Sequence, residues 1–174
     1  MIDVIGENKS MNKINLGSGK TKYWGYTNID YSGGQKKVPS KLIDIDMDFM
    51  KKEALPYDDN NVRKIKCYHL LEHLPSDVVV HLLSECYRVL INHGLLEITL
   101  PDPVNENPKQ IIKKYSTKTN NMHCNRIYKE DLKILLFSVG FHFVYEKSID
   151  YMREQDYYGY MMVADKRSRY VDDL

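Results

Sequence analysis

Short apolar runs closed by glycines, acids or turn residues dominate the first part of the chain. They predict four strands, over residues 13–16, 26–30, 42–46 and 62–68. Helical spacing of apolar residues begins only after the fourth run. A series of short buried strands joined to later helices is typical of an α/β fold with a mainly parallel sheet.

The first helix is predicted over residues 76–90, where apolar side chains recur at helical spacing: Val79, Leu82, Leu83, Cys86 and Val89 or Leu90. Ser76 is its expected N-cap, and the turn residues Asn92, His93 and Gly94 are expected to stop it. Residues 95–100 then form an apolar strand that Pro101 closes. The sheet therefore gains a fifth strand directly after the helix.

The last third of the chain opens with a long loop, residues 102–125, rich in proline and asparagine, with one helical turn expected near Ile111. A second helix is predicted over residues 129–139 and ends at Gly140. Two apolar strands, residues 141–147 and 158–164, lack a helix between them, so we expect them to pair antiparallel at a sheet edge. We expect residues 1–174 to form one domain, with its core over 13–166, an extension over 1–12 and a polar tail over 167–174.

Charge and cysteine content exclude several classes of partner. Lys and Arg number 25 against 24 Asp and Glu, so no net field draws the chain to nucleic acid or to an anionic membrane. No apolar run approaches the roughly 18 residues of a membrane span, and the first residues lack a signal-peptide pattern. Cys67, Cys86 and Cys124 form no CxxC pair, as expected of reduced thiols in a cytoplasmic protein.

A glycine turn and an acid carry the first chemical hypothesis. Gly17 and Gly19 directly follow the first strand, where a ligand must approach the backbone closely. Asp30 ends the next strand, and parallel neighbours bring both strand ends to one edge, where a carboxylate can accept hydrogen bonds from ribose hydroxyls. Lys22 stands where a dinucleotide motif needs its third glycine, which favours an adenosine ligand without phosphates. The simpler interpretation is a tight turn beside a solvated acid.

Residues 13–30, KINLGSGKTKYWGYTNID, resemble the first two strands of class I S-adenosylmethionine-dependent methyltransferases, in the subgroup where a short loop replaces the first helix. Segments similar to further family motifs follow in order: DF at 48–49, LPYDDN at 55–60, LEHLP at 71–75, ECYRVL at 85–90 and LPD at 100–102. The resemblance spans roughly residues 13–166. It departs from larger relatives over residues 20–25, which are too few for a helix, and over the glycine-rich residues 32–40.

The resemblance implies a Rossmann-like, doubly wound, mainly parallel seven-stranded sheet with an antiparallel last strand. It also implies S-adenosylmethionine as cofactor, held across the carboxyl ends of the first four strands, and no metal. Gly17, Ser18 and Gly19 would line its methionine and ribose, and Asp30 would accept from the ribose hydroxyls. The remaining implied residues are Asp48 and Phe49 at the adenine, with Asp46 as the rival of Asp48; Tyr68 and His69 at the amino-acid end; and Leu16, Tyr31 and Met47 as neighbours in the same site.

The segment His69-Leu70-Leu71-Glu72-His73 also spells HxxEH, a zinc metalloprotease motif. That motif requires one continuous helix to bring both imidazoles to one face. Residues 62–68 are predicted as a strand and Pro75 follows closely, so a strand-end turn is the better interpretation. In that turn, Glu72 and His73 fix the loop through hydrogen bonds.

The methyl acceptor is left open by the sequence. If it must lose a proton, His69, Asp102 and His123 are the candidate general bases. Residues 107–129 contain basic side chains and no acid, which favours an anionic small-molecule or saccharide acceptor. A non-catalytic cofactor-binding or scaffold module of the same fold is the alternative function. The oligomeric state also stays open, a dimer included.

Overall fold

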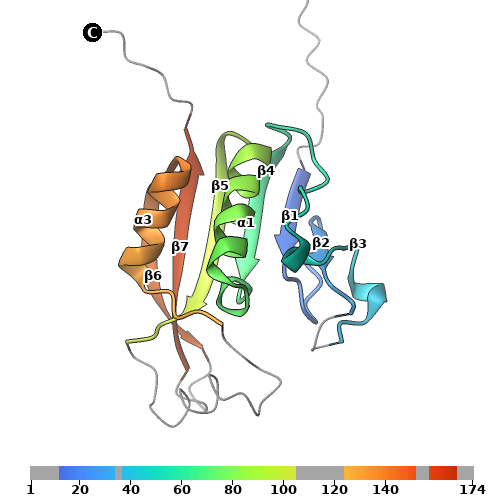
Figure 1. Cartoon of the computed structure of the whole chain (residues 1–174), viewed down its shortest axis with the longest axis horizontal. Coiled ribbons are helices and arrows are strands. Elements are labelled where there is room, and N and C mark those ends of the chain that lie inside the picture. Colours follow the sequence, from blue (N-terminus) through green and yellow to red (C-terminus); the bar gives the residue numbers. More distant parts are fainter. Residues whose placement is uncertain (1–11, 34–36, 105–123, 152–156, 168–174) are drawn as a thin grey trace, which may run out of the picture.

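The computed structural model describes residues 12–33, 37–104, 124–151 and 157–167. These residues form one seven-stranded sheet in the order β3-β2-β1-β4-β5-β7-β6 (Figure 1). Only β7 runs antiparallel to its neighbours, which confirms the predicted fold. The strands are β1 Asn12–Leu16, β2 Thr27–Asp30, β3 Ile45–Asp46, β4 Val62–Tyr68, β5 Leu90–Pro101, β6 Phe141–Tyr151 and β7 Tyr157–Lys166.

Three of the predicted strands differ from the observed ones by three residues or more at one end: β3, β5 and β6, the last of which continues from its predicted end at residue 147 to Tyr151. The strand expected over residues 42–46 is only Ile45 and Asp46 long. Ser40–Leu42 form a 3-10 turn, and pairing with β2 begins only at Ile45. β5 is longer than expected and begins at Leu90. Leu90 pairs with Val62, and pairing resumes at Leu95, so residues 91–94 bulge out of the strand. Asn92, His93 and Gly94 therefore lie within β5 and do not stop the helix.

Helix α1 spans Ser76–Val89, close to its predicted range, and buries the apolar stripe that predicted it. Ser76 is not its N-cap. Pro75 occupies the N-cap position, which has no side-chain cap, and the Ser76 hydroxyl instead donates to Asn125. Helix α3 spans Lys129–Val139 and ends at Gly140, whose φ of 116° is the left-handed conformation that favours glycine, as predicted.

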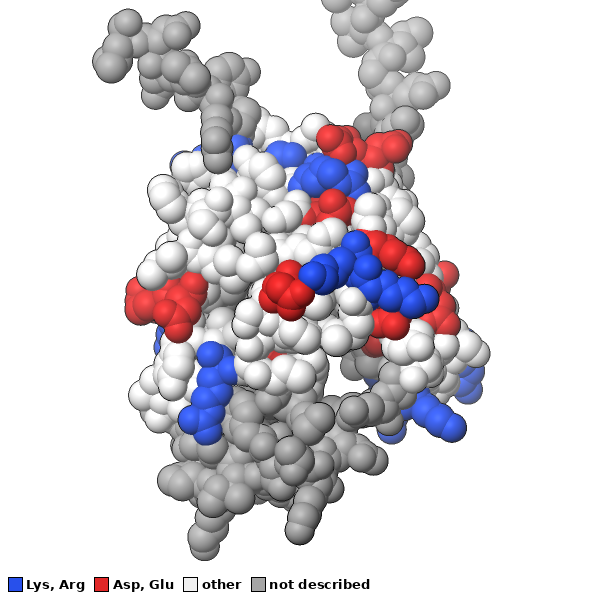
Figure 2. Space-filling model, in the orientation of Figure 1, with Lys and Arg blue, Asp and Glu red and all other residues white. Residues whose placement is uncertain are grey.

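The two described α-helices contact each other and cover one face of the sheet (Figure 1). Between them and the strands lies one apolar core, whose largest fully buried members include Ile14, Leu16, Ile29, Ile65, Leu83, Leu96, Ile98 and Tyr160. On the outer surface of this layer, Figure 2 shows basic and acidic side chains interspersed, with no large patch of one sign. None of the described helices is long and apolar enough to cross a bilayer.

No described α-helix covers the opposite face of the sheet, which is polar. Along β4, the buried Ile65 and Cys67 belong to the core, whereas Lys64, Lys66 and Tyr68 alternate with them and point the other way. The Lys66 ammonium lies 3.9 Å from the ring centre of Tyr23, 5.0 Å from Tyr26 and 5.4 Å from Tyr68. Residues 20–26 therefore lie against this face as a loop, in agreement with the prediction that they form no helix.

Candidate cofactor-binding site

The turn after β1 is built by two glycines in the left-handed region. Gly17 has φ of 64° and Gly19 has φ of 56°. The amides of Gly17 and Ser18 both donate to the Ile29 carbonyl of β2, at 2.9 and 3.3 Å, which fixes the turn against the neighbouring strand. The Ser18 hydroxyl is buried and has no hydrogen-bond partner among the described residues. Buried hydroxyls without a partner are rare in folded proteins, so Ser18 Oγ is a candidate ligand-binding group.

Asp30 lies directly beside this turn. One carboxylate oxygen, Oδ2, accepts from the Gly19 amide at 2.5 Å, and Oδ1 accepts from the Tyr31 amide at 2.7 Å. Each carboxylate oxygen has a second lone pair, so Asp30 can still accept from two hydroxyls. A Cβ placed on Gly19 would meet no atom within 4 Å, so open space adjoins the acid. The structure thus joins the two features that the sequence only suggested were neighbours.

The two rival adenine acids occupy different surroundings. Asp46 ends β3 and pairs with Asp30 across the strands. Its carboxylate accepts from the Ser32 amide at 3.0 Å and from the Ser32 hydroxyl, and these bonds lower the pKa of Asp46. Asp48 caps the 3-10 turn Phe49–Lys51 by accepting from the Met50 amide at 3.0 Å. Both acids remain candidates.

Three of the implied site residues have buried side chains. Leu16, Met47 and Phe49 are 0, 7 and 6 % exposed and belong to the apolar core. Only a small edge of the Phe49 ring is therefore open to a ligand. Tyr31, by contrast, is 38 % exposed beside Asp30. The burial of Leu16, Met47 and Phe49 leaves little of their side chains for a ligand to contact.

Tyr68 and His69 lie where β4 ends, but they face different surroundings. The Tyr68 hydroxyl donates to Glu97 of β5 at 2.9 Å, on the polar face of the sheet. His69 has φ of 53°, and its amide donates to the Thr99 carbonyl at 2.9 Å. Its Nδ1 lies 3.1 Å from Oε1 of Glu72. Both residues stay candidates for the amino-acid end of a ligand, and the His69 side chain is one-third exposed there.

The local geometry contradicts the zinc protease interpretation of HxxEH. β4 runs to Tyr68, His69 is left-handed, and only Leu71–His73 wind into a 3-10 turn before α1 begins. The continuous helix that the motif requires is not formed. Among the described residues no group of three His, Cys, Asp or Glu side chains could hold a metal ion.

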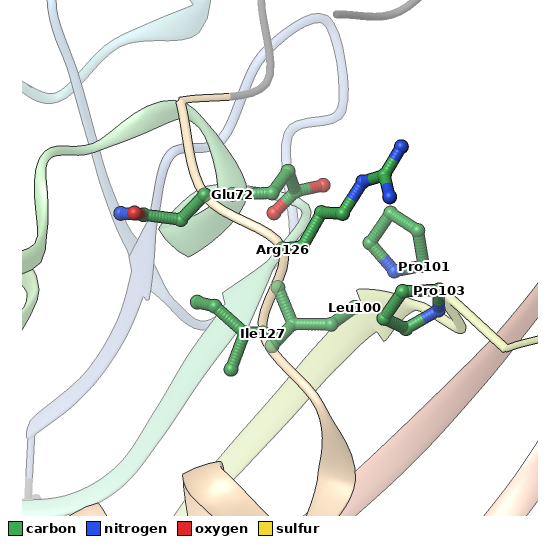
Figure 3. Close-up of a pocket in the computed structure, with 7 residues that line it drawn as sticks. Glu72, Leu100, Pro101, Pro103, Arg126 and Ile127 are labelled. Atoms are coloured by element: carbon green, nitrogen blue, oxygen red, sulfur yellow. The ribbon is translucent and has the colours of Figure 1, made fainter. Parts of the chain in front are cut away.

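Asp102 follows β5 and is buried, with Oδ1 accepting from the Val104 amide at 3.1 Å and Oδ2 lying 3.7 Å from the Lys129 ammonium. His123, and the basic residues of the long loop up to it, lie outside the described residues, as does the helical turn expected near Ile111. Pro101 and Pro103, which flank Asp102 in the sequence, line a small cavity of about 10 Å³ together with Glu72, Leu100, Asn125, Arg126 and Ile127 (Figure 3). Sequence reasoning missed this cavity, because residues 124–127 reach it only through the tertiary fold.

Residues 15–98 match the family described as "Methyltransferase domain". No curated protein matches the sequence. Similar solved structures include S-adenosylmethionine-dependent methyltransferases from Methanosarcina mazei (15 % identity, 90 % of this chain and 92 % of that chain, TM-score 0.64) and Archaeoglobus fulgidus (18 %, 89 % and 86 %, 0.65). Another, from Thermotoga maritima, is described as a possible histamine N-methyltransferase (15 %, 90 % and 82 %, 0.64).

The strand order, the antiparallel β7 and the glycine turn define a class I methyltransferase domain. Residues 15–98 carry the match to the methyltransferase-domain family, and the described sheet has the fold of the class I methyltransferases, as the motifs indicated. The similar solved structures from Methanosarcina mazei and Archaeoglobus fulgidus are described as dependent on S-adenosylmethionine. The orphan Ser18 hydroxyl, the open space at Gly19 and the spare lone pairs of Asp30 fit an adenosine with a polar tail.

Proposed function

We propose that this chain binds S-adenosylmethionine between the turn at residues 17–19 and Asp30, and transfers its methyl group to a small-molecule or saccharide acceptor. The observation that carries the proposal is the Asp30 carboxylate held at 2.5 Å by the Gly19 amide. That bond aims the acid and leaves lone pairs for two ribose hydroxyls. An isolated tight turn has no need of such a pairing.

The other cofactor contacts follow from where the strands end. Ser18 offers its hydroxyl to the ribose or methionine portion, and Asp46 or Asp48 accepts from the adenine amino group. His69 faces the amino-acid end, beside the methyl group. The bound cofactor supplies an activated methyl, so the chain's own work is to align the acceptor and take its proton.

Three residues are candidates for that proton. His69 has a side chain one-third exposed at the end of β4, whereas Asp102 is 6 % exposed and already engaged by a backbone amide. Accessibility favours His69 over Asp102 as the base. His123 stays a prediction outside the described residues.

A non-catalytic cofactor-binding module is the second candidate function. The open space at Gly19 and the absence of a helix over residues 20–26 favour it, because the adenosine side of the site is less enclosed than a helix would make it. Binding without turnover would be its signature.

Isothermal titration calorimetry with S-adenosylmethionine and with its demethylated product tests the binding site. We expect Asp30→Ala to weaken both at least roughly tenfold, because two charge-assisted hydrogen bonds are lost. Asp58→Ala is the matched control, since Asp58 is an exposed acid at the opposite end of β4. Wild-type protein that binds neither compound, or an Asp30→Ala variant with unchanged affinity, would refute the proposal.

Methyl transfer is then tested with a radiolabelled methyl donor and an acceptor panel. The panel contains phosphorylated sugars, nucleotide-linked sugars and neutral sugars, with histamine included because a structural neighbour bears that description. Transfer to a sugar supports the saccharide acceptor, and transfer to histamine alone contradicts it. Cofactor binding without methyl transfer to any panel member, or to any compound in an extract of small metabolites, favours the non-catalytic module.

A further inference from the structure

Glu72 is a buried acid that the cofactor contacts do not use. Its side chain is 3 % exposed on the 3-10 turn after β4. Oε1 lies 3.1 Å from His69 Nδ1, whereas Oε2 is buried with no hydrogen-bond partner among the described residues. Burying a carboxylate with an unsatisfied oxygen is costly, so its position needs a reason beyond packing.

Main-chain bonds hold both members of this contact in place. The Glu72 carbonyl accepts from the amides of Cys124 and Asn125, at 2.7 and 3.2 Å. The His69 amide is bonded to the Thr99 carbonyl of β5, and its left-handed φ of 53° is a strained conformation for a residue with a side chain. Strain of this kind persists where the surrounding structure fixes it, and it gathers at functional sites.

Glu72 also lines the cavity between β5 and residues 124–127 (Figure 3). The accessible volume of about 10 Å³ is close to that of one water-sized group. Glu72 thus both contacts His69 and lines a small void at the carboxyl end of the sheet.

We propose that Glu72 is a positioning residue that holds His69 as the proton acceptor for the methyl acceptor's hydroxyl or amine. This inference rests on the proposed function. A carboxylate at Nδ1 fixes the proton on that nitrogen and makes Nε2 the basic one. As the acceptor's lone pair bonds to the methyl carbon, the carbon–sulfur bond breaks with its electrons going to sulfur. The acceptor's proton passes to His69 Nε2 and then to water.

The assignment narrows the substrate class. An acceptor that needs this pair is a protic nucleophile, an alcohol or a neutral primary or secondary amine, which has both a lone pair to bond the methyl carbon and a proton to lose. A tertiary amine or a thioether has no such proton and would gain nothing from His69.

Nitrogen NMR of the histidine rings in the ligand-free protein tests the pair without turnover. Spectra are recorded above the usual titration range of histidine, and His69→Gln assigns the His69 signals among the six histidines. We expect wild-type His69 to carry its proton on Nδ1, and Glu72→Gln or Glu72→Asp to abolish that preference. Glu85→Gln, which alters another largely buried glutamate on α1, is the control and leaves His69 unchanged.

A proton on Nε2 in the wild-type protein overturns the proposal, even if both Glu72 variants fail to fold. An unchanged His69 tautomer in either folded variant does the same. For an acceptor found with the panel, we expect Glu72→Gln to lower kcat roughly tenfold or more at unchanged KM and unchanged affinity for the demethylated cofactor. A purely structural Glu72 would lower affinity and kcat together. Wild-type protein that does not bind the cofactor would refute the proposed function but not the Glu72–His69 pair, because the tautomer is measured without ligand.

Discussion

Replacing Gly17 by Ala tests whether the turn after β1 is held as tightly as its geometry indicates. Its φ of 64° costs an L-residue about 1–2 kcal/mol. An added Cβ would also lie 2.9 Å from Leu70 Cβ and 3.0 Å from Leu70 Cδ1. Leu70 Cβ is attached to the main chain, so it cannot move away as a side-chain tip could. Overpacking of this kind costs about 1–3 kcal/mol more, and we expect Gly17→Ala to lose about 3 kcal/mol in total.

Gly19→Ala is the matched comparison, because Gly19 has a similar φ of 56° and open space around its missing Cβ. We expect it to lose only the backbone part, about 1 kcal/mol. Urea denaturation measures both variants. With m of about 2 kcal/mol/M, the difference of about 2 kcal/mol separates their midpoints by about 1 M. Equal midpoints would refute the claim that Leu70 closes the space behind Gly17. Cofactor affinity should show the opposite order, with Gly19→Ala weakening binding more than Gly17→Ala, because the Gly19 Cβ enters the space assigned to the ligand.

Three further predictions concern the framework of the site. Arg88→Leu should lower the free energy of unfolding by about 2 kcal/mol, because Arg88 donates to the carbonyls of Leu55 and Tyr57 and to Glu85. Calorimetry should find cofactor affinity unchanged, and a large loss of affinity would contradict this structural role. Lys66→Met should lower the free energy of unfolding, measured by urea denaturation, by about 1–2 kcal/mol, because the Lys66 ammonium loses its contacts with three tyrosine rings. Lys13 lies over Tyr26 alone, at 5.9 Å, so Lys13→Met should lower it less, and equal losses would argue against the tyrosine cluster. Hydrogen bonds from Lys22 and then Asn28 lower the pKa of Asp44 to about 2, so its carboxylate stabilises the fold above about pH 4. Denaturation across pH should show Asp44→Asn less stable than wild type above about pH 4, with the difference vanishing as the pH falls toward about 2, and a difference that stays constant with pH would refute this prediction.

The family motifs predicted the fold well because they carry residues that contact one another across the fold. LPYDDN and ECYRVL are far apart in the sequence, yet Arg88 and Glu85 of the second bind the main chain of the first. α3 was predicted with its observed bounds, since Leu132 and Leu136 face the core and Gly140 supplies the left-handed end. Periodicity and a glycine stop are properties of the segment itself, so the sequence contains them in full.

The errors arose where tertiary contacts override local preference. Ser76 is a good N-cap residue by type, but Asn125 from the far side of the long loop takes its hydroxyl, and Pro75 holds the cap position. Residues 92–94 look like a helix stop, yet the earlier Leu90 already pairs with Val62. The contact between Glu72 and His69 could not be read from an i, i+3 spacing, because it depends on the left-handed backbone at His69.

The polar face of the sheet and the missing first helix are two aspects of one solution. A helix packed there would have to bury Lys64, Lys66 and Tyr68, and unpaired buried ammonium groups are prohibitively costly. A short loop can instead leave the charges near solvent, with Lys64 paired to Glu97 and Lys66 enclosed by tyrosines. The same loop leads from Gly19 to Asn28, whose side-chain amide bonds Asn15 of β1, Asp44 and the loop carbonyls of Tyr23 and Tyr26. Hydrogen bonds from the loop, in place of apolar helix packing, therefore hold the turn at residues 17–19 against the sheet. The alternation of lysine with buried residues along β4 is the sequence feature that predicts a polar face without a packed helix.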